Sequence, residues 1–281
     1  MSFWMRQASV QIGGAVYDMD DFYFEFEVPF EDTTTVQTAT VKIHNLAKST
    51  RDAIKKDQPM IINAGYEGDV GAVFVGKISA CSHQHSGTDW ITTVSAMSAM
   101  EEWLSSKVSK SYAQGTTSQE IVSDLLNLLG VEVGEFSLKQ NKVYDRGKVC
   151  SGKVKDCLKA VVVDDCKSRF LIRNDTIIIN DPDKGVQNGI LLTPESGLII
   201  SGQQKQDTII AAGADSQKSS GEKNDEGKTF SRDCLLNYHI GPSEQVVIQS
   251  ETLNGTFIVI KGKHTGSPKG KWLTTMELKP A

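Results

Sequence analysis

Strand-like alternation interrupted by glycine constrains this chain more than any other feature of its sequence. Residues 63–80 read NAGYEGDVGAVFVGKISA, in which short alternating runs are broken by four glycines. Alternating apolar and polar residues indicate strands, and glycines between such runs indicate tight turns. In DFYFEFEVPF the alternate residues from Phe22 to Phe30 are all apolar. The pattern predicts antiparallel β structure.

The first hundred residues contain several predicted strands. The aromatic run and VQTATVKIHNL flank the polar segment EDTTT, which predicts a hairpin, and Pro29 predicts an edge strand or a bulge. MIINAGY, AVFVGKISACSHQ and DWITTVSAM predict three more strands, with Gly65 and Gly68 at the turn between the first two. Residues 1–105 are therefore predicted to form one antiparallel β domain.

The pattern changes to a helical period after residue 105. In TTSQEIVSDLLNLLG, Thr117 and Glu120 have the spacing of a capping box, and Gly130 stands where a helix would end. SGKVKDCLKAVVVDDC predicts a second helix, and RFLIRNDTIIIND predicts two short strands about an Asn-Asp turn. Residues 106–182 are therefore predicted to be a small α/β module of two helices and a hairpin.

Strand-like runs return at residues 183–281. They include GILLTPESGLII, TIIAAG, EQVVIQS, TFIVIKGK and KWLTTMEL. Between them a segment rich in Ser, Gly, Lys and acids predicts a mobile loop near residues 213–230. The predicted fold class is mainly β with an α/β insert, in which residues 1–105 and 183–281 are two antiparallel β domains.

The two β regions share a faint repeat. Each has a glycine, a phenylalanine and a later strand that begins Trp-[Ile/Leu]-Thr-Thr: Gly71, Phe74 and Trp90 in the first, and Gly255, Phe257 and Trp272 in the second. Either the two hairpins resemble each other by chance, because β patterning is weakly specific, or a β domain is duplicated around the insert. Each tryptophan could anchor a subunit contact or pack in a core.

Composition argues against several classes of function. There are 30 Lys and Arg residues against 35 Asp and Glu, and a net charge of −5 does not suit a nucleic-acid binder. We expect neither membrane insertion nor a secretory leader, because no apolar run is long enough. The cysteines are odd in number and scattered, which suits reduced thiols: Cys81, Cys150, Cys157, Cys166 and Cys234.

Catalytic and metal-binding motifs do not stand out. HExxH, GxSxG, the P-loop and a GxGxxG unit are all missing, and adjacent acidic pairs do not indicate a glycosidase. Cys81, His83 and His85 alternate on one predicted strand and could begin a metal site. Zinc needs further ligands, and no second His or Cys pair follows, so a solvated hairpin end is favoured. We expect no catalytic residue, cofactor or metal.

Three segments resemble the phage tail baseplate hub proteins. NLAKSTRDAIKKDQPMIINAGYEGDVGAVFVGKI has the family's Asn-Leu, Ser/Thr-Arg spacer, Ala-Gly-Tyr strand end and Gly-Lys-Ile. LLNYHIGPSEQVVIQSETLNGTFIVIKGKHTGSPKGKWLTTMEL has its Leu-Leu-Asn, Gly-Pro and Asn-Gly-x-Phe positions, and the helix at 116–129 is similar to its middle module. The resemblance spans nearly the whole chain through short motifs.

The resemblance implies two tail-tube-like β-barrel domains in a non-enzymatic homotrimer. Three chains would place six such domains in a ring, which adapts a six-fold tail tube to a three-fold spike. The implied partners are the tail tube protein, the spike or tip protein, the tape-measure protein and other baseplate proteins, with DNA passing through the lumen without specific binding. The implied location is the virion tail, assembled in the bacterial host cytoplasm.

Related and rival functions stay open at this point. The same fold serves in phage-tail-like bacteriocins and other contractile injection systems. Many hub chains continue into a peptidoglycan hydrolase, whereas this sequence ends after its last predicted strand, so we expect another protein to digest the cell wall. The alternatives are a cell-wall hydrolase or peptidase on a β scaffold and a monomeric carbohydrate-binding module.

Overall fold

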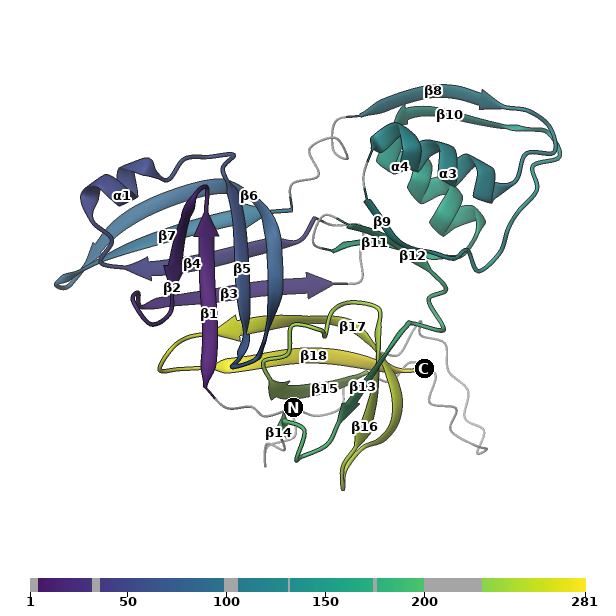
Figure 1. The fold of residues 1–281 in the computed structure, drawn as a ribbon. Coiled ribbons are helices and arrows are strands. Elements are labelled where there is room, and N and C mark those ends of the chain that lie inside the picture. The colour runs from purple at the N-terminus through teal and green to yellow at the C-terminus, as the bar shows by residue number, and fades with distance from the viewer. Residues whose placement is uncertain (1–4, 32–35, 99–105, 131, 174–175, 200–228) are drawn as a thin grey trace, which may run out of the picture.

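The structure is a computed structural model that describes residues 5–31, 36–98, 106–130, 132–173, 176–199 and 229–281. Three groups of elements follow one another along the chain (Figure 1): a β region in purple and blue, an α/β region in teal, and a second β region in green and yellow. The predicted strand TIIAAG lies outside the described residues, and so does almost all of the predicted loop at 213–230.

The first β region confirms the predicted strands. Its described elements are β1 (Arg6–Ile12), β2 (Ala15–Asp18), β3 (Phe24–Glu31), β4 (Thr38–His44), α1 (Lys48–Ala53), β5 (Pro59–Tyr66), β6 (Asp69–Ser86) and β7 (Asp89–Met97). Alternate residues of β3 and β4 are buried and the two strands pair antiparallel, as the period of two predicts.

Two predictions about turns and edges in this region have different outcomes. Gly68 has a φ of 83° and makes the turn between β5 and β6. Gly65 lies within β5 instead, where a Cβ would overlap the carbonyl oxygen of Asp69. Pro29 lies in the part of β3 beyond Glu27 that pairs with β17 but no longer with β4, so its position is locally an edge.

The α/β region contains more strands than predicted. Its described elements are β8 (Lys107–Tyr112), α3 (Ser118–Leu129), β9 (Glu132–Phe136), β10 (Lys148–Lys153), α4 (Val154–Lys159), the π-helix η1 (Ala160–Asp165), β11 (Arg169–Arg173) and β12 (Thr176–Asn180). The two helices and the antiparallel β11–β12 pair are confirmed. The short strands β8, β9 and β10 were missed because none has three apolar residues in alternation.

Helix α3 begins and ends where the sequence predicts. The hydroxyl of Thr117 accepts the N–H of Glu120, and the Glu120 carboxylate accepts the N–H of Thr117, which completes the capping box. Gly130 ends the helix with a φ of 62°. The second helix differs from the prediction, because its winding changes from α to π at Ala160.

The second β region returns the chain to the sheet of the first. Its described strands are β13 (Val186–Leu192), β14 (Leu198–Ile199), β15 (Phe230–Leu235), β16 (Glu244–Gln249), β17 (Asn254–Gly266) and β18 (Trp272–Pro280). β15 was not predicted. β13 pairs parallel with β16, and the other pairs of this region are antiparallel.

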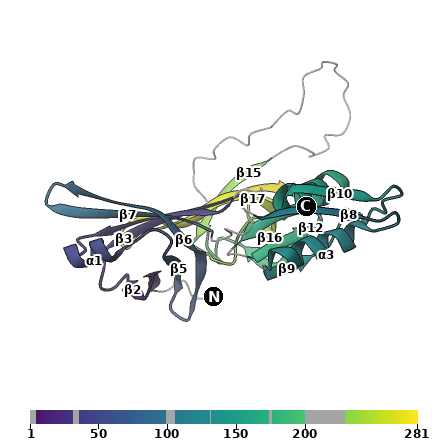
Figure 2. The same cartoon turned by 90° about the horizontal axis from the view of Figure 1, so that it is seen from above.

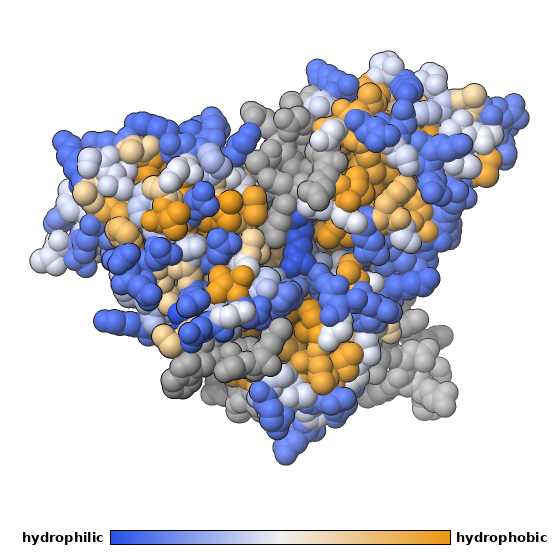
Figure 3. Space-filling model, viewed as in Figure 1, coloured by the Kyte–Doolittle hydropathy of each residue, from blue (hydrophilic) through white to orange (hydrophobic). Residues whose placement is uncertain are grey.

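One sheet runs through both β regions in the order β14-β15-β18-β17-β3-β4-β7-β6-β5-β1-β2, with β13 and β16 joined beside β17. Two hydrophobic cores pack on this sheet and a third fills the α/β region. The β6–β7 hairpin reaches one end of the molecule and the α/β region reaches the other (Figure 2). Hydrophobic residues gather over each of the three regions on the face drawn in Figure 3. The fold class, mainly β with an α/β insert, is confirmed.

Candidate assembly interface

The hairpins β6–β7 and β17–β18 pair in the same register. The matched cross-strand pairs are Trp90–His85 and Thr92–His83 in the first hairpin, and Trp272–Gly266 and Thr274–His264 in the second. Each ladder has one bulge at the same place relative to its tryptophan, after Ile78 in β6 and after Val259 in β17. Independent hairpins would have no reason to share both register and bulge.

The strands beside the hairpins repeat the match. β5 pairs with β6 as β16 pairs with β17, β4 pairs with β7 as β15 pairs with β18, and β3 pairs with β4 as β14 pairs with β15. Asp57 before β5 and Ser243 before β16 both have positive φ, 67° and 73°. Their N–H groups donate to the carbonyls of Ile78 and Val259, at 2.9 and 2.8 Å.

A five-stranded unit therefore occurs twice. We call β3–β4–β7–β6–β5 the first unit and β14–β15–β18–β17–β16 the second unit. Trp90 and Trp272 correspond, as the sequence repeat suggested, but Phe74 and Phe257 do not. The strand pairing matches Phe257 to Gly76 and Phe74 to Gly255, so the two phenylalanines lie two positions apart in the matched strands.

Strand β17 also joins the two units. Its pairing with β16 ends at Ile258, and its distal residues 261–266 pair antiparallel with residues 26–31 of β3. We call this pairing the unit joint. Gly262 and Gly266 permit the close approach, because a Cβ at either position would overlap an aromatic ring of β3.

The unit joint buries the distal half of the second hairpin. His264 is 3% exposed, with its ring 4.8 Å from that of Phe30 and its Nδ1 2.9 Å from the Thr274 hydroxyl. Burial lowers the pKa of His264 to about 3, so this imidazole is neutral. Trp272 is 2% exposed and meets Phe26 edge to face at 5.9 Å.

The corresponding half of the first hairpin is open. β5 pairs with β6 only as far as Lys77, so among the described strands residues 80–86 pair with β7 alone. We call residues 80–86 the open edge. His83 and His85 are exposed, and Trp90 is 39% exposed.

The hypothetical metal ligands of the sequence lie on this open edge. The Cys81 sulfur is 3.9 Å from Nε2 of His83, and Nδ1 of His83 is 3.2 Å from the Thr92 hydroxyl. His85 instead meets the ring of Trp90 edge to face at 5.1 Å. Within the described residues, no group of three His, Cys, Asp or Glu side chains is placed to hold a metal ion. The five cysteines are free thiols, and burial raises the pKa of Cys81.

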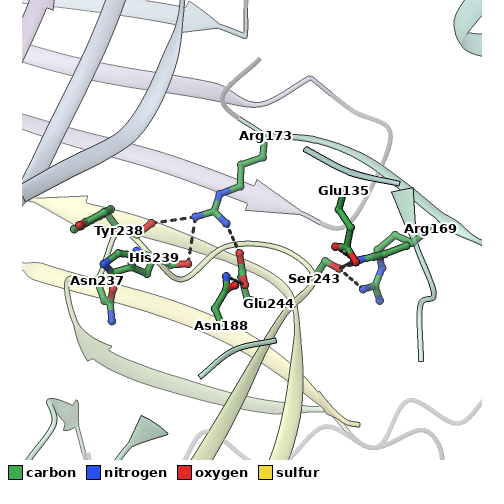
Figure 4. A network of polar contacts seen from close by, with 10 residues as sticks. Glu135, Arg169, Arg173, Asn188, Asn237, Tyr238, His239, Ser243 and Glu244 are labelled. Carbon is green, nitrogen blue, oxygen red and sulfur yellow. Dashed lines mark hydrogen bonds and ion pairs between the residues drawn. The ribbon is translucent and has the colours of Figure 1, made fainter. Parts of the chain in front are cut away.

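A polar network joins the α/β region to the second unit (Figure 4). Arg173 of β11 forms an ion pair with Glu244 of β16 at 2.5 Å and donates to the carbonyls of Tyr238 and His239. Asn188 donates to the other carboxylate oxygen of Glu244. Burial raises the pKa of Glu244 to about 7, and the charge of Arg173 opposes that shift.

The segment 237–244 contacts all three regions of the molecule. The Ser243 hydroxyl accepts hydrogen bonds from Arg169 at 2.6 Å and from Asn180 at 2.9 Å, both in the α/β region. The Tyr238 hydroxyl donates to Asp69 at the start of β6, at 2.8 Å. This segment belongs to the LLNYHIGPSEQ motif, and its contacts give the motif a structural role that the sequence did not reveal.

Solved structures share this architecture. A 43 kDa tail protein of prophage MuSo2 from Shewanella oneidensis matches with a TM-score of 0.66 and 10% identity over 98% of each chain. A tail protein from Neisseria meningitidis MC58 matches with a TM-score of 0.67 and 10% identity over 98% of this chain and 97% of that one. The chain has the fold of phage tail proteins.

The tail-protein fold extends to secretion machinery. The Escherichia coli protein c3393, a type VI secretion component with structural similarity to the T4 tail proteins gp27 and gp5, matches with a TM-score of 0.60 and 11% identity. That match covers 97% of this chain and 76% of c3393.

No family model and no curated protein matches the sequence. The resemblance to baseplate hub proteins is confirmed at the level of the fold. Among the described residues, no helix has the length and apolar character needed to cross a membrane.

Proposed function

We propose that this protein is a non-enzymatic structural hub of a phage tail or a phage-tail-like particle. Three copies form a ring in which each chain contributes two units. Six similar units then face a six-fold tail tube, while the ring as a whole keeps the three-fold symmetry of a spike. A duplicated unit inside a closed oligomer is a direct way to join the two symmetries.

The register match between the two units carries this proposal. Two units with the same strand order, register and bulge present nearly the same backbone, so one chain can occupy two neighbouring positions of a six-fold contact. The unit joint supports it as well, because it joins neighbouring units edge to edge through strand pairing, a contact that can repeat around a ring.

The proposal names partners and a division of the chain. The tail tube protein binds one side of the ring and the spike or tip protein binds the other, with tape-measure and further baseplate proteins nearby in the virion tail. Residues 1–105 and 183–281 form the two tail-tube-like domains, and 106–182 form the module between them. A net charge of −5 fits a lumen through which DNA passes unbound.

Light scattering on the purified chain tests the ring. A mass of three times 30.7 kDa, alone or after mixing with the spike protein of the same particle, is the expected result. Co-purification with the spike and tube proteins tests the adaptor role. A chain that stays monomeric with both partners present would contradict the proposal.

A further inference from the structure

The two-stranded sheet of the α/β region has one face that is exposed along its whole length. Among the described strands β8 and β10 pair only with each other, and inward side chains such as Cys150 pack on the core of this region. The sheet lies on the outer side of helices α3 and α4 (Figure 1). The outward residues are all exposed: Lys107, Ser109, Ser111, Val149, Ser151 and Lys153. We call these six residues the basic face.

The basic face holds two positive charges against each other. Lys107 and Lys153 are directly opposite in the antiparallel register, and neither forms an ion pair within the described residues. Lys110 and Lys148, the other lysines of this sheet, each have an aspartate partner at 2.7 Å. Like charges that face each other across a strand pair are destabilising. Val149 of the same face is 68% exposed. An acidic surface that covers this face relieves the repulsion and buries Val149.

The chain carries a complementary surface elsewhere. Between Arg6 and Lys42 the sequence has seven acids and no Lys or Arg. Three of them, Asp18, Asp20 and Asp21, are exposed and form no ion pair within the part of the chain that the structure describes. We call these three residues the acidic end, because β2, which leads into them, is the strand at one end of the large sheet. Asp18 and Asp20 also line a hollow of about 280 Å³, which offers space for a lysine side chain.

We propose that the basic face of one copy of the chain docks on the acidic end of a second copy. This inference rests on the proposed ring and specifies one of its contacts. β2 and the β8–β10 sheet lie far apart in both Figure 1 and Figure 2, so the two surfaces meet only between chains. Because they are different surfaces, the contact continues from chain to chain until it closes. Opposite charges across it favour the correct partner and speed the encounter.

The distribution of charge favours a second copy over nucleic acid as the occupant of the basic face. Residues 1–105 contain 14 Asp and Glu against 7 Lys and Arg, whereas residues 106–182 contain 10 against 12. A net charge of −5 repels a polyanion that approaches the chain as a whole. A second copy instead brings its acids at a fixed place, and every copy offers one basic face and one acidic end.

Charge reversal tests the contact. One variant carries Lys107→Glu and Lys153→Glu, and another carries Asp18→Lys and Asp20→Lys. With the spike protein present, each variant should need a chain concentration at least about tenfold higher for half-assembly, because like charges then meet. A chain with all four substitutions again has opposite charges on the two surfaces. It should assemble at a concentration within about threefold of that of the parent, as measured by light scattering.

Controls separate a local contact from a change in net charge or folding. Lys159→Glu with Lys167→Glu alters the net charge equally, at two exposed residues on the helical side of the same region, and should assemble like the parent. Urea unfolding of every variant shows whether the fold is kept. Added salt should weaken assembly of the parent chain, because the Debye length falls from about 10 Å at 0.1 M to about 3 Å at 1 M.

Carbodiimide crosslinking of the unaltered chain gives a second measurement that does not depend on the variants. The reagent joins an amine to a carboxylate that it touches. In an equal mixture of isotope-labelled and unlabelled chains, mass spectrometry shows which links join two copies. Links from Lys107 or Lys153 to the acidic end are expected between copies. The ion pair of Lys263 with Glu27, 3.1 Å apart within one chain, is the positive control for the reagent.

The outcomes separate this inference from the proposed function. A trimer whose assembly neither charge reversal changes, or that forms the control link without any link between the two surfaces, overturns the inference and leaves the hub function standing. Weaker assembly in both variants without recovery in the chain with four substitutions also overturns it. Assembly that continues beyond three copies supports the contact and contradicts the three-fold ring. A parent chain that stays monomeric with the spike and tube proteins contradicts both.

Discussion

The distal halves of β6 and β17 have the same register, the same bulge and a histidine opposite a threonine, yet one half is open and the other is covered. Trp272 is 2% exposed and Trp90 is 39% exposed. β3 lies against the second hairpin, whereas no strand of the described chain lies against the distal part of the first. Burial at these matched positions therefore depends on the neighbouring unit rather than on the hairpin itself.

Truncating the two matched tryptophans should give the largest difference in stability between the two hairpins. Trp272→Ala leaves a cavity under the unit joint and should lower the free energy of unfolding by about 4 kcal/mol. Trp90→Ala removes a ring that is partly in solvent and stacks on Arg51, and should cost about 1 kcal/mol or less. Urea unfolding of both variants measures the difference. Equal losses would show that the joint is not what distinguishes them.

The matched residues Glu244, which begins β16, and Gln58, which precedes β5, should show the next largest difference. Glu244→Ala leaves Arg173, whose side chain is 19% exposed, without its carboxylate and should cost about 3 kcal/mol. The side chain of the counterpart Gln58 hydrogen-bonds to the N–H of Lys55 and the carbonyl of Ala53, both close in sequence, so Gln58→Ala should cost about 1 kcal/mol.

The double variant Arg173→Met with Glu244→Leu is the control for this ion pair. It removes both charges together and should recover most of the lost stability in the same urea titration. A double variant as unstable as Glu244→Ala would mean that packing, rather than an unpaired charge, causes the loss.

An added methyl group at Gly262 tests the close packing of β17 against β3 at the unit joint. Gly262→Ala places a Cβ against the Phe30 ring and the carbonyl oxygen of Thr275, and should cost about 2 kcal/mol through overpacking. Its counterpart Cys81 already carries a Cβ, so Cys81→Ala should cost less than about 1 kcal/mol. Thermal unfolding checks both values, and a stable Gly262→Ala variant would argue against close approach of β17 and β3.

Acid should destabilise the protein through the covered histidine, His264. The pKa of His264 is lowered to about 3 in the fold, so below about pH 6.5 the unfolded chain binds the proton more readily and stability falls until about pH 3. Between about pH 7 and pH 5.5 the loss should be about 1 kcal/mol. His264→Gln should remove this part of the pH dependence, whereas His83→Gln should leave it.

Glu244 changes stability in the opposite sense over part of this window. Its pKa is raised from 4.5 to about 7, so its contribution is present below about pH 4.5 and is lost as pH rises from there to about 7. Comparing each histidine variant with the parent protein at every pH cancels this term. Identical pH profiles for the parent and His264→Gln would contradict a buried neutral imidazole.

Local rules read from the sequence predicted much of the fold. The alternation from Phe24 to Phe30 gave the buried face of β3, and the Thr117–Glu120 pair gave the start of α3. These local rules failed where the structure of a segment depends on a neighbouring segment. β9 has no alternation of its own and exists because β12 offers it a parallel partner. Gly65 was assigned to a turn because its sequence does not show the carbonyl of Asp69 beside it.

The candidate interface shows the same limit. The Trp-x-Thr-Thr repeat was visible in the sequence, but its alignment through Phe74 and Phe257 was wrong, because matching two residues of one type does not give the register of the strands on which they lie. The open edge was noticed as Cys81, His83 and His85 and considered as a metal site. Only the strand pairing of two distant hairpins identifies it as the counterpart of residues 261–266 of β17, which pair with β3.

The sequence by itself determined both helices of the α/β region, most strands of the two β regions and the apolar face of the alternating strands, and that two β regions flank an α/β module. Those properties follow from period, capping and turn residues within a few positions of one another. The tertiary structure decided that the two regions share one sheet, that the second hairpin is covered by β3, and that the first is left open. Strand pairing uses backbone groups that every residue carries, so the choice of partner depends on long-range geometry.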